Sequence, residues 1–191
     1  MSELKRKGKI VKVIGPMFCG KSTELIRCVN RQRLGNKKVQ VFRPKSDFRS
    51  PSNTVQSRDS GTVKAIEIGA LDDLLDALDD DTNVVAIDEV QFLPDIVEIC
   101  NVLTANGYDM IISGLDFTYQ GTPFRMDGFG CILDVIAEQT ISLTAVCMEK
   151  GCSNDAPFTE RIVHGNTIKL TGDKETYRAV CRDHFGTFCV T

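Results

Sequence analysis

Long hydrophobic runs are absent from this sequence of 191 residues. No apolar stretch approaches the roughly 18 residues that a membrane-spanning helix needs, so we expect no membrane association. We also expect no secretory leader, because the basic segment at residues 5–9 is followed only by IVKVI before Gly15 and Pro16, too short for the apolar region of a signal peptide. We therefore expect residues 1–8 to form a solvated tail on a cytoplasmic protein.

A positive net charge is also absent. The net charge is −3 and the sequence pI is near 5.4, so the overall charge gives no support for nucleic-acid binding. The composition of 42% hydrophobic and 26% charged residues fits a compact protein with one main core. Eight cysteines without a leader predict reduced thiols or metal ligands rather than a disulfide framework.

The segment GPMFCGKST at residues 15–23 fits the spacing G-x-x-x-x-G-K-[ST] of a phosphate-binding loop. It stands between a short apolar run at 10–14 and a helical pattern that carries Leu25, Ile26 and Val29. The helix dipole and free amides at that position favour an anion. We expect Lys21 to reach the β- and γ-phosphates of ATP and the Ser22 hydroxyl to hold Mg²⁺. The backbone that cradles the phosphates is Gly15, Pro16, Met17, Phe18, Cys19 and Gly20.

Strand and helix patterns alternate along the first 114 residues. The expected strands are 10–14, 39–42, 62–68, 83–87 and 109–113, and the expected helices run from Ser22 to Gly35, over 70–81 and over 94–105. The acidic residues within 70–81 are interpreted as the solvated face of a helix, and the polar, proline-bearing segment 43–53 as a loop. This alternation predicts an α/β fold: a P-loop (RecA-like) core over 9–146, with a mostly parallel sheet flanked by helices.

Asp88 and Glu89 follow the apolar run 83–87. They are therefore expected at the carboxyl end of a buried strand, the edge where open α/β sheets bind ligands. Asp88 can complete the Mg²⁺ site with Ser22, because this hard cation prefers carboxylate oxygen. Glu89 is then a second carboxylate beside the reacting phosphate, and we expect it to be the general base that accepts a proton from an attacking hydroxyl.

Residues 147–191 show a different chemistry. Cys147 and Cys152 form one close pair, and Cys181 and His184 form another. A Cys₃His set of this kind predicts a structural Zn²⁺ site in a small lobe with little core of its own. Cys189 is an alternative fourth ligand. His164 is interpreted as a turn residue, and Cys28, Cys100 and Cys131 as small core residues.

Five ordered segments now carry a family resemblance: GPMFCGKSTELIR, AIDEVQF, GLDFTYQGTPF, AEQTISLTAVC and YRAVCRDH. Together they resemble the cytosolic, zinc-containing type II thymidine kinases over residues 9–184. The resemblance implies ATP-dependent phosphorylation of the 5′-hydroxyl of thymidine or deoxyuridine, with Glu89 as the general base. It also implies a homotetramer that thymidine triphosphate (dTTP) inhibits.

The resemblance further implies binding residues. For ATP and its phosphates these are Gly15 to Ser22, Asp47, Arg49, Asp88 and Gln91. On the core side the nucleoside pocket would be lined by Met17, Phe92, Leu115, Tyr119 and Phe124. A loop of the zinc lobe, called the lasso, would close the pocket with Thr159, Ile168, Lys169, Leu170, Thr171, Gly172 and Tyr177. A flat, mostly apolar thymine base suits aromatic walls with a few aimed backbone groups.

Two other functions share part of this pattern. A P-loop followed by DEVQ also occurs in RecA-like motors and helicases, but these usually pair two such cores and this chain has room for one. A nucleotide sensor without catalysis is the second alternative, and the presence of Glu89 beside Asp88 disfavours it. DNA-stimulated ATP hydrolysis would indicate the motor, and ATP binding without turnover the sensor.

Overall fold

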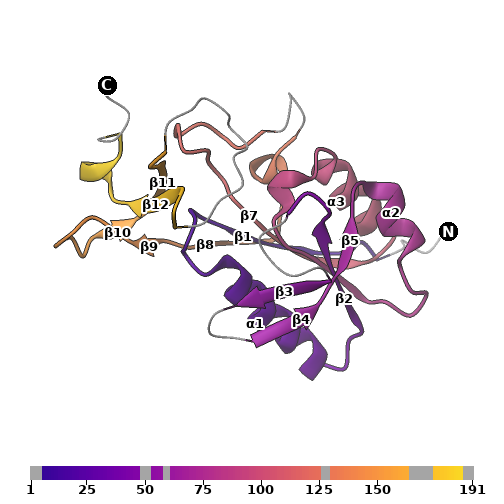
Figure 1. The fold of residues 1–191 in the computed structure, drawn as a ribbon. Coiled ribbons are helices and arrows are strands. Elements are labelled where there is room, and N and C mark those ends of the chain that lie inside the picture. The colour runs from indigo at the N-terminus through magenta and orange to yellow at the C-terminus, as the bar shows by residue number, and fades with distance from the viewer. Residues whose placement is uncertain (1–5, 48–52, 58–60, 126–129, 164–173, 187–191) are drawn as a thin grey trace.

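A computed structural model describes residues 6–47, 53–57, 61–125, 130–163 and 174–186 (Figure 1). The helices are α1 (Lys21–Leu34), α2 (Leu71–Asp76) and α3 (Ile96–Ala105), with 3-10 turns η1 (Val90–Phe92), η2 (Ile132–Asp134) and η3 (Arg182–His184). The strands of the main sheet are β1 (Ile10–Ile14), β2 (Val39–Pro44), β5 (Ile66–Ile68), β6 (Val84–Ile87), β7 (Asp109–Gly114) and β8 (Gln139–Ser142). The remaining strands are β3 (Thr54–Ser57), β4 (Gly61–Lys64), β9 (Ala145–Val146), β10 (Asp155–Ala156), β11 (Phe158–Arg161) and β12 (Tyr177–Val180).

The central sheet has six strands in the order β5-β2-β6-β7-β1-β8, and every neighbouring pair is parallel. β7 lies between β1 and β6, so the loop after β1 and the acidic pair after β6 lie at the same carboxyl edge. In open α/β sheets, ligands bind at that edge where the strand order reverses. The predicted α/β class with a parallel sheet flanked by helices is confirmed.

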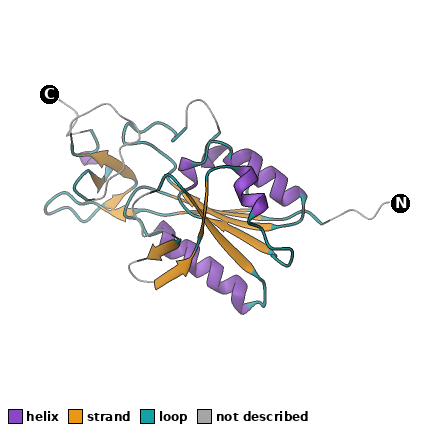
Figure 2. Ribbon diagram, turned by 45° about the vertical axis from the view of Figure 1, so that its right-hand side comes forward, coloured by secondary structure: helices purple, strands orange, loops and turns teal. Residues whose placement is uncertain are grey.

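Apolar residues cover both faces of the sheet, as expected for parallel strands. On one face Leu25, Ile26 and Val29 of α1 pack on the sheet, and on the other Ile96, Ile99 and other residues of α3 join Leu74 of α2. Figures 1 and 2 show α1 on one side of the strands and α2 with α3 on the other. Each of these fully buried side chains contributes roughly 1.5–3 kcal/mol of hydrophobic stabilisation.

The segment 62–68 differs from the single strand expected there. Its first half, β4, pairs antiparallel with β3, whereas its second half, β5, pairs parallel with β2 at the edge of the main sheet. Ala65 lies between them, and its N–H donates to the Asn53 carbonyl. The segment therefore forms two strands rather than one, because its two halves pair with different strands.

The small C-terminal lobe contains two antiparallel ribbons, β9 with β10 and β11 with β12. It lies at the opposite end of the molecule from the N-terminus (Figure 2). Its small apolar cluster holds Ala145, Ala156, Ala179 and Val180 together with two of the predicted metal ligands. Side chains this small bury little area, which agrees with the expectation that a metal stabilises the lobe.

Among the described residues, every helix is too short or too polar to cross a membrane.

Candidate active site

The loop between β1 and α1 has the backbone that its glycines require. Gly15 has φ 147° and Gly20 has φ 87°, conformations that residues with a side chain rarely adopt. A Cβ atom at Gly15 would also lie 2.4 Å from the Leu143 carbonyl oxygen, just after β8. The two glycines of the motif therefore fold the loop over the first turn of α1, where unpaired helix amides attract an anion.

Lys21, the first residue of α1, is buried. Its Nζ donates to the Pro16 carbonyl oxygen at 2.6 Å and lies 3.8 Å from the Cys19 sulfur. The ammonium group therefore stays inside the loop, on the side where phosphate oxygens would bind. Burial raises the pKa of the Cys19 thiol despite the nearby Lys21, so this cysteine is neutral at physiological pH.

The residues predicted to hold Mg²⁺ are in contact. Ser22 Oγ donates to Asp88 Oδ2 at 2.7 Å, and Asp88 Oδ1 accepts from Ser113 Oγ and from the Glu89 N–H. Burial, followed by the charge of Glu89, raises the pKa of Asp88 to about 6. A hydroxyl beside a carboxylate is the oxygen donor set that a hard cation prefers, so these side chains fit Mg²⁺.

Glu89 follows Asp88 and caps η1 with φ 54°. A left-handed conformation at a residue with a side chain costs on the order of 1–3 kcal/mol and is common at functional sites. The Glu89 carboxylate accepts a hydrogen bond from Gln91 Nε2. The turn at Glu89 thus follows the end of β6, and the two successive carboxylates there have different partners: Asp88 accepts from Ser22 and Ser113, and Glu89 accepts from Gln91.

An apolar cluster lies beside these groups. Met17, Leu115, Phe124 and Tyr177 are buried together, with Phe18, Phe92 and Tyr119 packed against them. The rings of Phe92 and Phe124 meet edge to face, 6.2 Å apart with an interplanar angle of 80°. The structure therefore brings together residues from four distant segments that the resemblance assigned to the nucleoside pocket.

Two residues of β11 connect this cluster to the C-terminal lobe. Thr159 Oγ1 accepts a hydrogen bond from the Met17 N–H at 2.9 Å, so the predicted pocket residue Thr159 contacts the phosphate-binding loop directly. Arg161 is buried, and its guanidinium lies over the Tyr119 ring, 5.4 Å from the centroid. Arg161 was missed by the sequence analysis, because its pairing with Tyr119 depends on tertiary structure.

Asp47 is buried beside a residue outside the predicted site. Arg43, only 2% exposed, lies 3.6 Å from its carboxylate and also donates to its backbone carbonyl. A second donor group of Arg43 bonds to the Thr54 carbonyl oxygen at 2.9 Å. Asp47 is thus held in an ion pair at the end of β2, whereas its predicted companion Arg49 lies outside the described residues.

Ser113 is a second buried polar residue near the site that was not predicted from the sequence. It is the one polar residue between apolar positions 110–112 and Gly114 in β7, and it is fully buried. A hydroxyl at the end of a buried strand is a usable sequence signal, since such a group needs a hydrogen-bond partner. Its partner Asp88 directly follows the neighbouring strand β6 and is not indicated by spacing along the chain.

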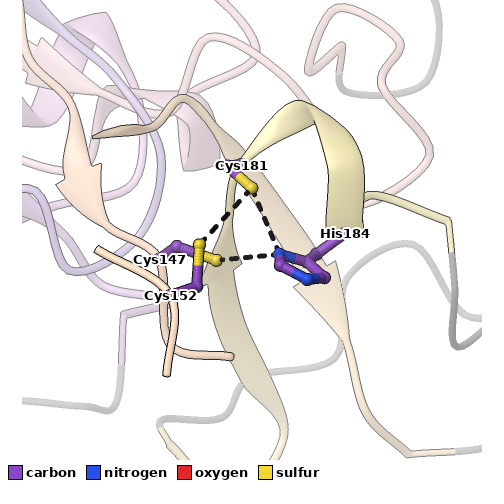
Figure 3. Close-up of side chains that lie close together, drawn as sticks. All are labelled: Cys147, Cys152, Cys181 and His184. Carbon is purple, nitrogen blue, oxygen red and sulfur yellow. Dashed lines mark hydrogen bonds between the residues drawn. The ribbon is translucent and has the colours of Figure 1, made fainter. Parts of the chain in front are cut away.

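The four predicted zinc ligands form one cluster in the C-terminal lobe. Their sulfur and nitrogen atoms all lie within 4.8 Å of one another, and Figure 3 shows the four side chains converging. Two of the distances are 3.2 Å from Cys181 Sγ to His184 Nδ1 and 3.9 Å between the sulfurs of Cys152 and Cys181. Ligands of a tetrahedral Zn²⁺ are about 3.8 Å apart when each sulfur is about 2.3 Å from the ion. The set Cys147, Cys152, Cys181 and His184 therefore fits zinc, and the alternative ligand Cys189 lies outside the described residues.

The electrostatics of this cluster favour the thiolate form of Cys147 and Cys181, whereas burial and these two neighbours raise the pKa of Cys152. Burial opposes ionisation of Cys181, but hydrogen bonds from His184 and nearby backbone groups lower its pKa to about 6. The pKa of Cys147 is also lowered, and that of His184 is raised by its two cysteine neighbours. Thiolates are the form that binds metal.

The predicted lasso residues Ile168, Lys169, Leu170, Thr171 and Gly172 lie outside the described residues, as does His164.

Comparison with known proteins gives consistent results. The family described as "Thymidine kinase" matches residues 8–185. A thymidine kinase of Myxoma virus (strain Lausanne) is 38% identical over 175 residues, which cover 92% of this chain and 94% of the relative. The thymidine kinase of Yaba monkey tumor virus (strain VR587) is 40% identical over 179 residues, covering 93% and 94%. A bacterial thymidine kinase, from Ureaplasma parvum serovar 3 (strain ATCC 27815), is 38% identical over 192 residues, covering 94% and 83%.

A P-loop on a parallel sheet, with a serine–aspartate contact and a second carboxylate at the same edge, is typical of P-loop proteins that bind a nucleoside triphosphate. The Cys₃His cluster and the family match show which family within this class the chain belongs to. The chain belongs to the thymidine kinase family, in its zinc-containing type II group, and is an ATP-dependent phosphotransferase.

Proposed function

We propose that this enzyme transfers the γ-phosphate of ATP to the 5′-hydroxyl of thymidine and of deoxyuridine, and so forms deoxynucleoside monophosphates for nucleotide salvage. The observation that carries the proposal is the contact between Ser22 and Asp88, with Glu89 at the next position and the apolar cluster adjoining the same loop. Phosphate-binding, proton-accepting and base-binding groups therefore meet at one edge of the sheet.

The phosphate end of the site is formed by the backbone of residues 15–22 and by Lys21. Lys21 Nζ is 2.6 Å from a loop carbonyl, and exchanging that partner for phosphate oxygens gives a stronger, charge-assisted contact. Ser22 and Asp88 would hold Mg²⁺, which supplies charge neutralisation on the β- and γ-phosphates. Asp47, Arg49 and Gln91 remain predicted contributors to ATP binding.

Glu89 acts as the general base. Asp88 accepts three hydrogen bonds, from Ser22, Ser113 and the Glu89 N–H, whereas the Glu89 carboxylate accepts a hydrogen bond from Gln91. A carboxylate placed there accepts the proton of the 5′-hydroxyl as that oxygen attacks the γ-phosphate, and the phosphate–ADP bond breaks.

The nucleoside binds against the apolar cluster. Phe92, Leu115, Phe124 and Tyr177 offer flat or branched apolar surfaces that match the faces of thymine. The polar edge of the base needs aimed hydrogen-bonding groups, and we assign these to Thr159 and to the lasso residues 168–172. Closure by the lasso also keeps water from the γ-phosphate.

Zinc bound by the Cys₃His cluster has a structural role, because all four donors come from protein side chains and no ligand position is left for substrate. Its binding stabilises a lobe whose own apolar cluster consists mainly of small residues.

Regulation and assembly follow the family expectation. dTTP carries both a thymine base and a triphosphate, so one molecule fits the apolar cluster and the phosphate loop together and inhibits the enzyme. We propose a homotetramer in the cytoplasm, without nucleic-acid or membrane partners.

The test is phosphotransfer with Mg²⁺ and γ-labelled ATP. Thymidine, deoxyuridine, deoxycytidine, deoxyadenosine, deoxyguanosine and single-stranded DNA are offered separately to the wild type and to Glu89→Gln. We expect label on thymidine and deoxyuridine, and a kcat lowered about 10²–10⁴-fold in Glu89→Gln with ATP binding retained. Near-normal turnover by Glu89→Gln would remove its role as base. If label were released only as free phosphate, and faster in the presence of DNA, we would reject the kinase function in favour of a DNA-stimulated motor.

A further inference from the structure

Gln91 lies between two parts of the site. It is the second residue of η1, the 3-10 turn that begins directly after Asp88 and Glu89, and the residue is only 2% exposed. Its Nε2 donates to the Glu89 carboxylate, and its Oε1 accepts from the Leu115 N–H at 3.0 Å. One amide therefore joins the proposed base to the residue that begins the nucleoside-facing segment after β7.

The orientation of this amide is fixed by its partners. The Leu115 N–H can only donate, so it must face the oxygen of Gln91, and the nitrogen must then face Glu89. Gly114 leaves the room for this arrangement, because a Cβ atom at that position would lie 2.8 Å from Gln91 Oε1. The Gln91 nitrogen is thus presented as a donor to the carboxylate.

Glu89 needs such support. Its backbone is already constrained by the left-handed φ and by the N–H bond to Asp88 Oδ1 at 3.0 Å. These contacts fix the start of the side chain and leave the direction of the carboxylate to its own partners. A general base must be held within hydrogen-bond reach of the proton that it accepts, because small displacements of a reacting group lower the rate strongly.

We propose that Gln91 is a positioning residue that holds the Glu89 carboxylate toward the nucleoside 5′-hydroxyl and couples it to the Leu115 wall of the pocket. This role is distinct from the phosphate contact that the family resemblance implies for Gln91, which stays a prediction. It rests on the proposed function, in which Glu89 is the base and Leu115 lines the nucleoside pocket.

The test uses three variants of the full-length enzyme. Gln91→Met keeps the length of the side chain and removes its hydrogen bonds, and Gln91→Asn keeps the amide but is too short to reach both partners. The matched control is Gln40→Met, because the Gln40 amide likewise joins separate segments: its nitrogen donates to the Ala77 carbonyl, and its oxygen accepts from the Asp79 N–H and the Thr82 hydroxyl. Gln40 lies in β2 and contacts none of the site residues in these bonds.

We expect kcat to fall 10–100-fold in both Gln91 variants, while KM for ATP and for thymidine stays within about twofold. Gln40→Met should lower thermal stability to a similar degree and leave kcat unchanged. A higher KM for ATP with unchanged kcat would overturn the inference in favour of the phosphate contact. A kcat loss that Gln40→Met shares would reduce the role of Gln91 to general stability.

A double-mutant cycle separates the inference from the function on which it rests. If Gln91 acts through Glu89, then adding Gln91→Met to Glu89→Gln lowers kcat no further. Full additivity of the two losses would refute the positioning role and leave Glu89 as the base. Wild-type turnover in Glu89→Gln alone would instead refute the proposed base, and the inference with it.

Discussion

Replacing Asp88 by asparagine should stabilise the free enzyme while it abolishes activity. Asp88 is buried, and its pKa is raised to about 6 from the ordinary 3.8, first by burial and then by the charge of Glu89. Asparagine is nearly the same size and carries no charge. Its oxygen accepts from Ser113 and from the Glu89 N–H, and its nitrogen donates to Ser22 Oγ. The variant therefore keeps the hydrogen bonds and loses the buried charge.

The expected gain in the free energy of unfolding follows from the linkage between protonation and folding. The folded-state pKa lies about 2 units above the unfolded value, which corresponds to at most about 3 kcal/mol of destabilisation once the group is ionised in both states. Because the folded protein binds the proton more tightly, this contribution lowers stability progressively as pH rises from about 4 to 6 and is constant above. Asp88→Asn should thus gain about 1–3 kcal/mol at pH 8 and only about 0.5 kcal/mol at pH 4.

Urea or thermal unfolding without nucleotide or Mg²⁺, at pH 8 and near pH 4, measures this difference. For a chain of this length, 1–3 kcal/mol corresponds to a rise of about 2–12 °C in Tm. Asp109→Asn is the control with the opposite sign, because bonds from Lys37, the Lys9 N–H and Arg6 overcome its burial and lower the pKa of Asp109. An Asp88→Asn variant no more stable than the wild type at pH 8, or equally stabilised at both pH values, would refute the reasoning.

Three further predictions concern the loop and the metal. Lys21→Ala should lower kcat/KM for ATP about 10²–10³-fold through the lost charge on the phosphates, and an unaltered steady-state rate would contradict the P-loop assignment. Cys152→Ser should contain less zinc, measured by atomic absorption, and should have a Tm lower by about 10 °C or more. The control Cys28→Ala should keep its zinc. An undiminished zinc content in Cys152→Ser would exclude the proposed ligand set. Gly15→Ala should abolish ATP binding in calorimetry, since its Cβ has no space beside Leu143; normal affinity would show that the loop tolerates another path.

The phosphate-binding loop and the first strands could be predicted because their signals are local. Glycine spacing, an apolar run and a helical face occur within about 25 consecutive residues, and the structure confirms β1, α1, β2, β6 and β7 close to the predicted bounds. The Cys₃His cluster was predictable for a similar reason, since close pairs of thiol and imidazole ligands are rare without a metal.

Features that depend on distant partners were not predictable. β8 has polar residues at Gln139 and Thr140 and becomes a strand only by pairing with β1. α2 ends at Asp76 rather than continuing to residue 81, and just beyond it the Ala77 carbonyl and the Asp79 N–H bond to the Gln40 side chain in β2. The division into a tail at 1–8, a core at 9–146 and a lobe at 147–191 stays a prediction, as do the site roles of the individual residues.

The contact between the phosphate-binding loop and the C-terminal lobe has a mechanical consequence. Phe18 and Cys19 pack on the apolar cluster that includes Cys147 and Cys181, and the Met17 N–H is bonded to the lobe. The predicted ATP-binding loop and the Cys₃His cluster are therefore in direct contact. Loss of the metal would destabilise the lobe surface that packs against the loop. We therefore expect removal of zinc to lower the affinity for ATP, although zinc has no direct contact with the nucleotide.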